Sequence, residues 1–102
     1  MNEQDQATLK DAVTTWGVNA QLVMVLEECA ELSKEITKTI RTKKVTQGLA
    51  EEIADVEIML AQLSIIAAEL DDTTLDSRVT ERRSFKLDRL RARLADWKRD
   101  HR

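Results

Sequence analysis

The chain has 102 residues, 42% of them hydrophobic, and a net charge of −3, which suits one domain spanning residues 1–102. Proline is absent, glycine occurs twice and aromatic residues make up 3%, so helices are favoured over strands, which draw on aromatic and β-branched residues. The single cysteine excludes an intrachain disulfide, and no apolar run approaches the roughly 18–20 residues that span a bilayer.

Charge is distributed unevenly along the chain. Residues 1–77 carry 6 Lys/Arg against 15 Asp/Glu, whereas residues 78–102 carry 10 against 4. The basic segment of residues 78–102 is either a tail that binds nucleic acid or a helix that packs against an acidic helix, and we favour the second interpretation. The polar N-terminus carries acids where a signal peptide carries basic residues, so we expect a cytoplasmic protein without membrane contact.

Apolar residues at helical spacing predict two helices in the first part of the chain. The first helix covers about residues 3–15 and stops at Gly17, because glycine is a common helix terminator. The second begins either at Val18 or after a cap at Asn19. It runs to about Lys43, with cations where a helix C-terminus prefers them.

Two further helices are expected in the second part of the chain. Thr46 is the expected cap of the third helix, which ends near Leu70, and the fourth runs from Leu75 to Asp100. The fold class is therefore all-α, an antiparallel helical bundle of about four helices. Helices of about 25 residues are roughly 38 Å long and leave more apolar surface than one chain covers, so we expect dimerisation to complete the bundle.

Two pairs of carboxylates stand three residues apart on the second and third expected helices, Glu28 with Glu31 and Glu52 with Asp55. Residues at this spacing share one face of a helix. At about 100° per residue, Glu52 falls inside the apolar sector of its helix and the other three acids lie at a sector edge. Carboxylates on a core side are costly unless they are compensated. If the helices pack antiparallel, the four oxygen ligands suit Mg²⁺ or Mn²⁺, which also recruit phosphate oxygens.

A purely structural explanation of these acids is also open. Ion pairs with Lys34, Lys38 or the basic fourth helix would neutralise the acids of the second helix. The repeated apolar context around both acidic pairs favours a shared site instead.

The same residues carry a resemblance to a known family. The stretches WGVNAQLVMVLEECAELSKEI and LAEEIADVEIMLAQL resemble the MazG-like, all-α nucleoside triphosphate pyrophosphohydrolase superfamily, whose motif is E-E-x-x-E, a spacer and E-x-x-D. Further on, FKLDRLRARL is similar to the K-x-x-R-L element of small single-domain members. The matching positions are Glu27, Glu28, Glu31, Glu52, Asp55, Lys86 and Arg89.

The resemblance implies Mg²⁺-dependent hydrolysis of an NTP or dNTP between the α and β phosphates, yielding NMP and pyrophosphate, with Mn²⁺ as an alternative ion. The metal ligands that it implies are Glu28, Glu31, Glu52 and Asp55. Lys86 and Arg89 are the expected catalytic cations, which would neutralise the negative charge of the phosphates. Glu27 belongs to the motif but points outward on its helix, so we expect it either to orient a water molecule or to support a metal ligand from outside the site.

Further substrate contacts are marked less strongly in the sequence. Arg93 and Lys38 are candidates for the phosphates, and Gln21 precedes the ligands by one or two helical turns. Trp16 either stacks on a base or belongs to the core, and the core is the commoner place for such a Trp. Cys29 lies on an apolar stripe, and we interpret it as a packing residue and not as a nucleophile.

Two other classes of protein fit part of the pattern. A di-iron carboxylate bundle expects Glu-x-x-His, and the only histidine is His101, which excludes that class. A non-enzymatic dimeric helical adaptor or nucleic-acid-binding protein would use the arginines of the fourth helix. Aspartates interrupt that basic run, so nucleic acid is the less favoured partner. We expect a homodimer or homotetramer that binds a nucleoside triphosphate.

Overall fold

The computed structural model describes residues 1–101, which form helices joined by short turns. The helices are α1 (Glu3–Trp16), α2 (Val18–Thr42), α3 (Gln47–Glu69) and α4 (Leu75–Asp100). Residues 1–101 contain no strand, so the prediction of an all-α chain with four helices is confirmed. The contacts divide the chain into two compact units, one covering residues 1–71 and the other beginning at Asp72, and each is described by itself.

The first helix is fixed at both ends by its capping residues. Asn2 Oδ1 accepts the backbone N–H of Asp5 at 2.8 Å, and Asp5 Oδ2 accepts that of Asn2 at 3.2 Å, which makes a capping box. Gly17 ends α1 with φ +91°, a conformation that L side chains rarely adopt. The same glycine precedes Val18, the first residue of α2. The start at Val18 is thus confirmed, and a cap at Asn19 is wrong.

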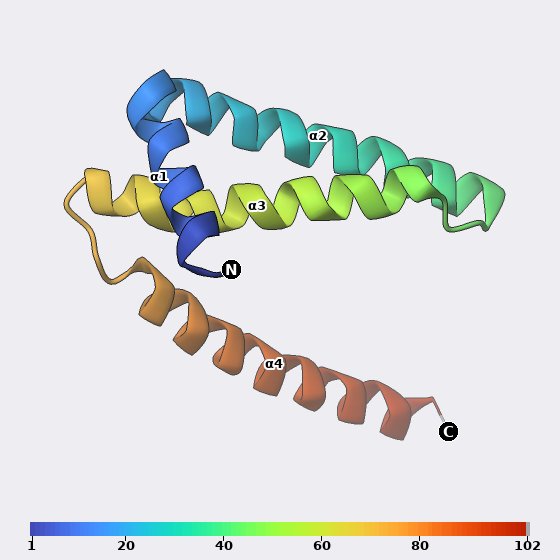
Figure 1. The fold of residues 1–102 in the computed structure, drawn as a ribbon. Coiled ribbons are helices and arrows are strands. Elements are labelled where there is room, and N and C mark those ends of the chain that lie inside the picture. Colours follow the sequence, from blue (N-terminus) through green and yellow to red (C-terminus); the bar gives the residue numbers. More distant parts are fainter. Residues whose placement is uncertain (102) are drawn as a thin grey trace. The chain divides into compact units, whose positions relative to one another are not determined.

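Helices α2 and α3 form an antiparallel hairpin, and α1 crosses it near the start of α2 and the end of α3 (Figure 1). Lys43 closes α2 in the left-handed conformation, and its N–H donates to the Thr39 carbonyl at 2.8 Å. Thr46 caps α3 as expected, because its Oγ1 accepts the Leu49 N–H at 3.2 Å.

The core of the first unit lies where α1 crosses the hairpin. Its buried apolar side chains are Leu9, Val13, Val25 and Ile66. Burial of each such side chain contributes about 1.5–3 kcal/mol, so this small cluster holds the three helices together. Two polar side chains, Gln21 and Gln62, are buried beside them.

The hairpin leaves a flank of apolar side chains exposed. These residues are Leu26, Cys29, Ile36 and Ile40 on α2, and Ile53 and Leu60 on α3. At 3.6 residues per turn they occupy the side of each helix that is turned away from the contacts with α1. The interpretation of Cys29 as a packed residue is therefore wrong for the single chain. A contiguous exposed apolar face is typical of a surface that another protein covers.

The second unit consists of α4 and the turn that precedes it. Asp72 accepts the N–H of Thr74 at 2.8 Å and its hydroxyl at 2.9 Å, and it pairs with Arg78. The backbone hydrogen bond from Thr74 is the largest of the contacts that hold the pKa of Asp72 below its usual range. No residue of α4 is buried. None of the helices in residues 1–101 has both the length and the apolar character needed to cross a membrane.

Candidate metal centre and nucleotide site

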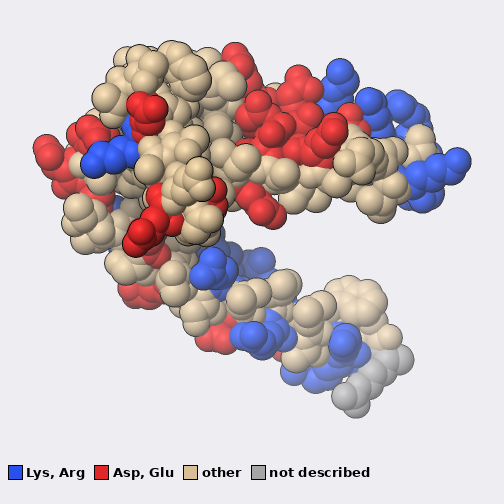
Figure 2. Space-filling model, viewed as in Figure 1, with Lys and Arg blue, Asp and Glu red and all other residues tan. Residues whose placement is uncertain are grey.

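Three carboxylates from two helices meet on the α2–α3 hairpin. Glu28 of α2 and Glu52 and Asp55 of α3 each offer an oxygen atom, and these atoms lie within 4.8 Å of one another. All three residues are half-buried. The antiparallel packing brings the acidic pair of α2 opposite that of α3, and Figure 2 shows acidic side chains gathered over the hairpin. The structure thus brings together three of the four expected ligands, which we call the acidic cluster.

The acidic cluster carries negative charge that its own surroundings do not neutralise. Desolvation raises the pKa of Glu28 above its usual value, and the charges of Asp55 and Glu52 raise it further. Desolvation also raises the pKa of Glu52, followed by the charge of Asp55. Among the described residues, Glu52 Oε2 is buried and has no hydrogen-bond partner. A divalent cation that prefers oxygen ligands would supply the missing partner and relieve the repulsion, so the donor set fits Mg²⁺ or Mn²⁺.

Glu31 and Glu27 lie outside the acidic cluster. Glu31 is exposed on α2, yet its negative charge contributes to the raised pKa of both Glu28 and Glu52. It therefore stands at the open edge of the cluster, where solvent reaches it. Glu27 is exposed and lies about 100° around α2 from Glu28, in agreement with its expected outward direction.

Glu35 of α2 is half-buried and forms one of the ion pairs expected for the acids of this helix. Its side chain is only 15% exposed and forms a 3.0 Å ion pair with Lys38. The carboxylate lies against Gly48 of α3, where an added Cβ would be 3.0 Å from Glu35 Oε2. The ion-pair explanation therefore holds for Glu35, and it engages Lys38, one of the expected phosphate contacts. Gly48, a small residue near the start of α3, is the sequence feature that could have indicated this close approach of an α2 side chain.

An apolar pocket of about 540 Å³ lies where α1 crosses the hairpin. Its lining includes Trp16 of α1, Met24 of α2 and Met59 of α3. Met24 precedes Glu28 by four residues and Met59 follows Asp55 by four, so the pocket begins about 6 Å along the helix axes from the acidic cluster. One turn of helix separates the charged site from the apolar one.

Two expected substrate contacts line this pocket. Trp16 is 67% exposed, so its interpretation as a core residue is wrong for the single chain. Gln21 is buried, and its Oε1 accepts a hydrogen bond from Nε2 of Gln62 at 2.6 Å. Gln62 was missed because a lone glutamine in an apolar helix matches no motif.

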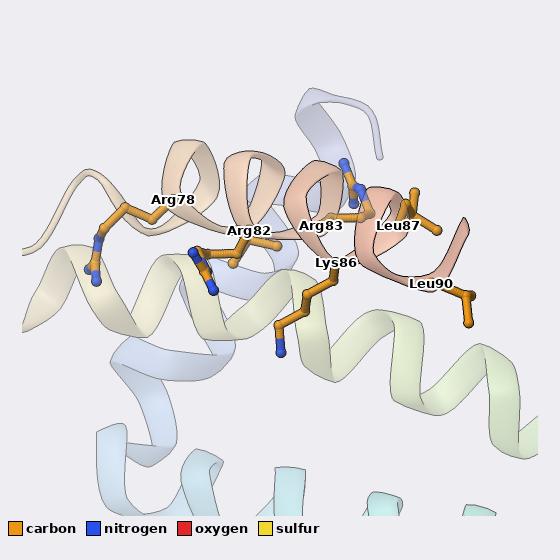
Figure 3. A pocket seen from close by; sticks show the side chains of 7 residues that line it. Arg78, Arg82, Arg83, Lys86, Leu87 and Leu90 are labelled. Carbon is orange, nitrogen blue, oxygen red and sulfur yellow. The ribbon is translucent and has the colours of Figure 1, made fainter. Parts of the chain in front are cut away.

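The expected phosphate contacts of α4 belong to an exposed row of cations. Arg78, Arg82 and Lys86 recur every four residues and project from one side of the helix (Figure 3). At 3.6 residues per turn, Arg89 and Arg93 continue the same row. An apolar stripe that includes Val79, Leu87 and Leu90 lies beside it.

The ion pairs within α4 leave part of this row unpaired. Two arginines of α4 form ion pairs with an aspartate one turn away, Arg91 with Asp88 and Arg99 with Asp96. Within residues 1–101, Lys86, Arg89 and Arg93 form no ion pair with an acid. These three cations are therefore available to an anionic ligand or to an acidic surface.

Comparison of the chain with protein-family models, with curated proteins and with solved structures found no match. The resemblance to the MazG-like superfamily thus stays a prediction that depends on the motif residues and on the arrangement described above.

Proposed function

We propose that the protein is a divalent-metal-dependent nucleoside triphosphate pyrophosphohydrolase, which cleaves the α–β phosphoanhydride to NMP and pyrophosphate. The observation that supports this most is the acidic cluster, in which Glu52 Oε2 is buried without a partner beside two further carboxylates. Buried acids that only stabilised the fold would have cations or hydrogen-bond donors against them. The repeated acidic motif and the resemblance to the MazG-like superfamily point to the same activity.

Glu28, Glu52 and Asp55 would hold Mg²⁺ or Mn²⁺, and Glu31 is the nearest further ligand at the edge of the cluster. The bound ion supplies neutralisation of phosphate charge and a water of lowered pKa. Glu27, the exposed residue that precedes Glu28 on α2, would orient the attacking water or accept its proton. The apolar pocket one turn away receives the base and sugar, with Trp16 at its rim.

Cations on the other side of the triphosphate complete the proposed site. Lys86 and Arg89 are proposed to bind phosphate oxygens during the reaction, and Arg93 extends the same row. Lys38 is the fourth candidate, although its ion pair with Glu35 must then be shared with the substrate.

A homodimer or homotetramer is part of this proposal. The exposed apolar flank of α2 and α3 and the apolar stripe of α4 are surfaces that a second copy would cover. Residues 1–77 are net acidic and residues 78–102 are net basic, so the basic segment of one copy is complementary in charge to the acidic segment of another. In such an assembly α4 of one copy brings its cations to the acidic cluster of the other, within a single MazG-like domain of residues 1–102.

The experiment that tests the proposal compares two neighbouring glutamates. Glu52→Gln removes a proposed ligand, whereas Glu51→Gln removes an exposed acid of the same helix and serves as the matched control. We expect Glu52→Gln to abolish pyrophosphate release from a panel of NTPs with Mg²⁺ while circular dichroism shows unchanged helicity. Normal turnover by Glu52→Gln would show that the site is assigned wrongly.

The exposed cations of α4 support a second candidate, a non-enzymatic adaptor or nucleic-acid-binding protein. It predicts salt-sensitive retention of DNA or RNA and no Mg²⁺-dependent release of pyrophosphate. The acidic balance of residues 1–77 makes this candidate the weaker one.

A further inference from the structure

One side of the α2–α3 hairpin carries three different chemical environments in a fixed order. Residues spaced alternately four and three positions apart share one side of a helix. On α2 this row consists of Met24, Glu28, Glu31, Glu35 and Lys38, and on α3 the opposite row consists of Met59, Asp55, Glu52 and Gly48. The apolar pocket therefore comes first and the acidic cluster second, and an ion pair beside Gly48 comes third, towards the turn that joins the helices.

The ion pair fixes an ammonium group next to the acidic cluster. Lys38 Nζ lies 3.0 Å from Glu35 Oε1, and the Glu35 carboxylate lies against Gly48, four residues before Glu52 on α3. At 1.5 Å per residue, four residues correspond to about 6 Å along the helix axis. The charge of Glu35 is among those that raise the pKa of Glu52, in agreement with this short separation. A cation is thus held one helical turn beyond the proposed metal ligands.

The ammonium group of Lys38 has room for a further anion. Within residues 1–101 it donates one hydrogen bond, to Glu35, whereas an ammonium group has three donors. The side chain of Lys38 is 44% exposed, so a ligand reaches it from solvent. An ion pair this exposed contributes little to stability by itself, which leaves the position of the lysine to be explained by what it binds.

We propose that Lys38, held by its ion pair with Glu35, is a specificity-determining residue that binds the outermost phosphate of a nucleoside triphosphate. The apolar pocket takes the base, the inner phosphates lie at the acidic cluster, and the phosphate chain runs towards the α2–α3 turn. The two outer phosphates of a triphosphate cover the step of one helical turn to Lys38, and the single outer phosphate of a diphosphate ends short of it. The site therefore selects nucleotides by the number of their phosphates, an inference that rests on the proposed function.

The test measures binding without turnover. Calorimetric titrations of the full chain in Mg²⁺ compare α,β-methylene analogues of nucleoside tri- and diphosphates, in which carbon replaces the oxygen of the bond to be cleaved. For the base that binds best, we expect the triphosphate analogue to bind at least about tenfold more tightly than the diphosphate analogue, because it gains a charge-assisted hydrogen bond.

A pair of variants attributes this preference to Lys38. Lys38→Gln should weaken binding of the triphosphate analogue by about tenfold and leave binding of the diphosphate analogue nearly unchanged. Lys10→Gln removes an exposed positive charge of α1 and should leave both affinities unchanged. A Lys38→Gln protein that binds both analogues as the unaltered protein does, or that loses affinity for both equally, would overturn the proposal.

The direction of the bound nucleotide has its own measurement. The chain has three methionines, and two of them, Met24 and Met59, line the apolar pocket. In protein labelled with methyl-¹³C methionine, NOEs from the base protons of the triphosphate analogue should reach the methyl groups of Met24 and Met59. NOEs from the base to Val45 in the α2–α3 turn would show the opposite direction and would overturn the proposal.

Failure of this inference and failure of the proposed function give different results. Release of pyrophosphate from a nucleoside triphosphate, together with equal affinities for the tri- and diphosphate analogues, would refute the inference and leave the function standing. A preference for the triphosphate analogue that depends on Lys38, without release of pyrophosphate from any triphosphate, would refute the function and leave the inference standing. Binding of neither analogue would refute both.

Discussion

The removal of one carboxylate from the acidic cluster should have opposite effects with and without a divalent ion. At pH 7 without metal, Glu52→Gln should raise the melting temperature, because the raised pKa of Glu52 shows that its negative charge is unfavourable in the folded chain. With Mg²⁺ present the order should reverse, since the variant has lost a proposed ligand. Glu51→Gln, an exposed neighbour, should follow the unaltered protein in Mg²⁺.

The size of the metal effect follows from the single acidic cluster found within residues 1–101 of each copy. A single bound ion stabilises the folded state by about 1.4 kcal/mol for each tenfold increase of free ion above the dissociation constant. For a chain of about 100 residues this corresponds to a rise of roughly 6–11 °C per tenfold increase in Mg²⁺. Differential scanning fluorimetry over a Mg²⁺ series measures that slope. A melting temperature that does not depend on Mg²⁺, or an equal slope for Glu52→Gln, would refute the assignment of the cluster as a metal site.

Three further predictions concern pH, phosphate contacts and assembly. The pKa values of Glu28 and Glu52 are raised in the folded chain, so their contribution to stability is present below the unfolded value of 4.5 and is lost as pH rises through the folded values. Thermal melts in EDTA should therefore show a lower melting temperature at pH 7 than near pH 5. Saturating Mg²⁺ should remove this decrease. Lys86→Gln should lower kcat/KM for a triphosphate by about 10- to 100-fold through loss of a charge-assisted contact in the transition state, whereas steady-state kinetics of a Lys98→Gln control should be unchanged. Leu60→Asp puts a charge on the exposed apolar flank and should dissociate the oligomer in sedimentation experiments, and a protein that is monomeric before the substitution would contradict the assembly.

Much of the acidic cluster was predictable because it depends on local periodicity. The spacing of Glu28 within α2 and of Glu52 and Asp55 within α3 places them near the core side of their helices. The antiparallel packing of two consecutive helices then brings the two segments together, and a short turn makes that packing the simplest one. Local signals also predicted the helix ends, through Gly17 and the cap at Thr46.

The remaining features depend on contacts between distant parts of the chain. Gln62 pairs with Gln21 across 41 positions, and neither residue carries a local signal of that pairing. Cys29 is predicted to be a packing residue, and a core position is the commoner of the two alternatives for Trp16, yet the single chain exposes both. Periodicity shows that a side chain lies on an apolar stripe, but it does not show what covers that stripe. The approach of Glu35 to Gly48 likewise becomes visible only when α2 and α3 are packed.

The identity of the reaction products tests the central claim most directly. When the protein is incubated with Mg²⁺ and a panel of nucleoside triphosphates, ³¹P NMR should detect pyrophosphate and nucleoside monophosphate in equal amounts, and EDTA should stop their formation. Release of orthophosphate with a nucleoside diphosphate, or no hydrolysis of any triphosphate, would contradict the account of the acidic cluster as a centre for cleavage between the α and β phosphates.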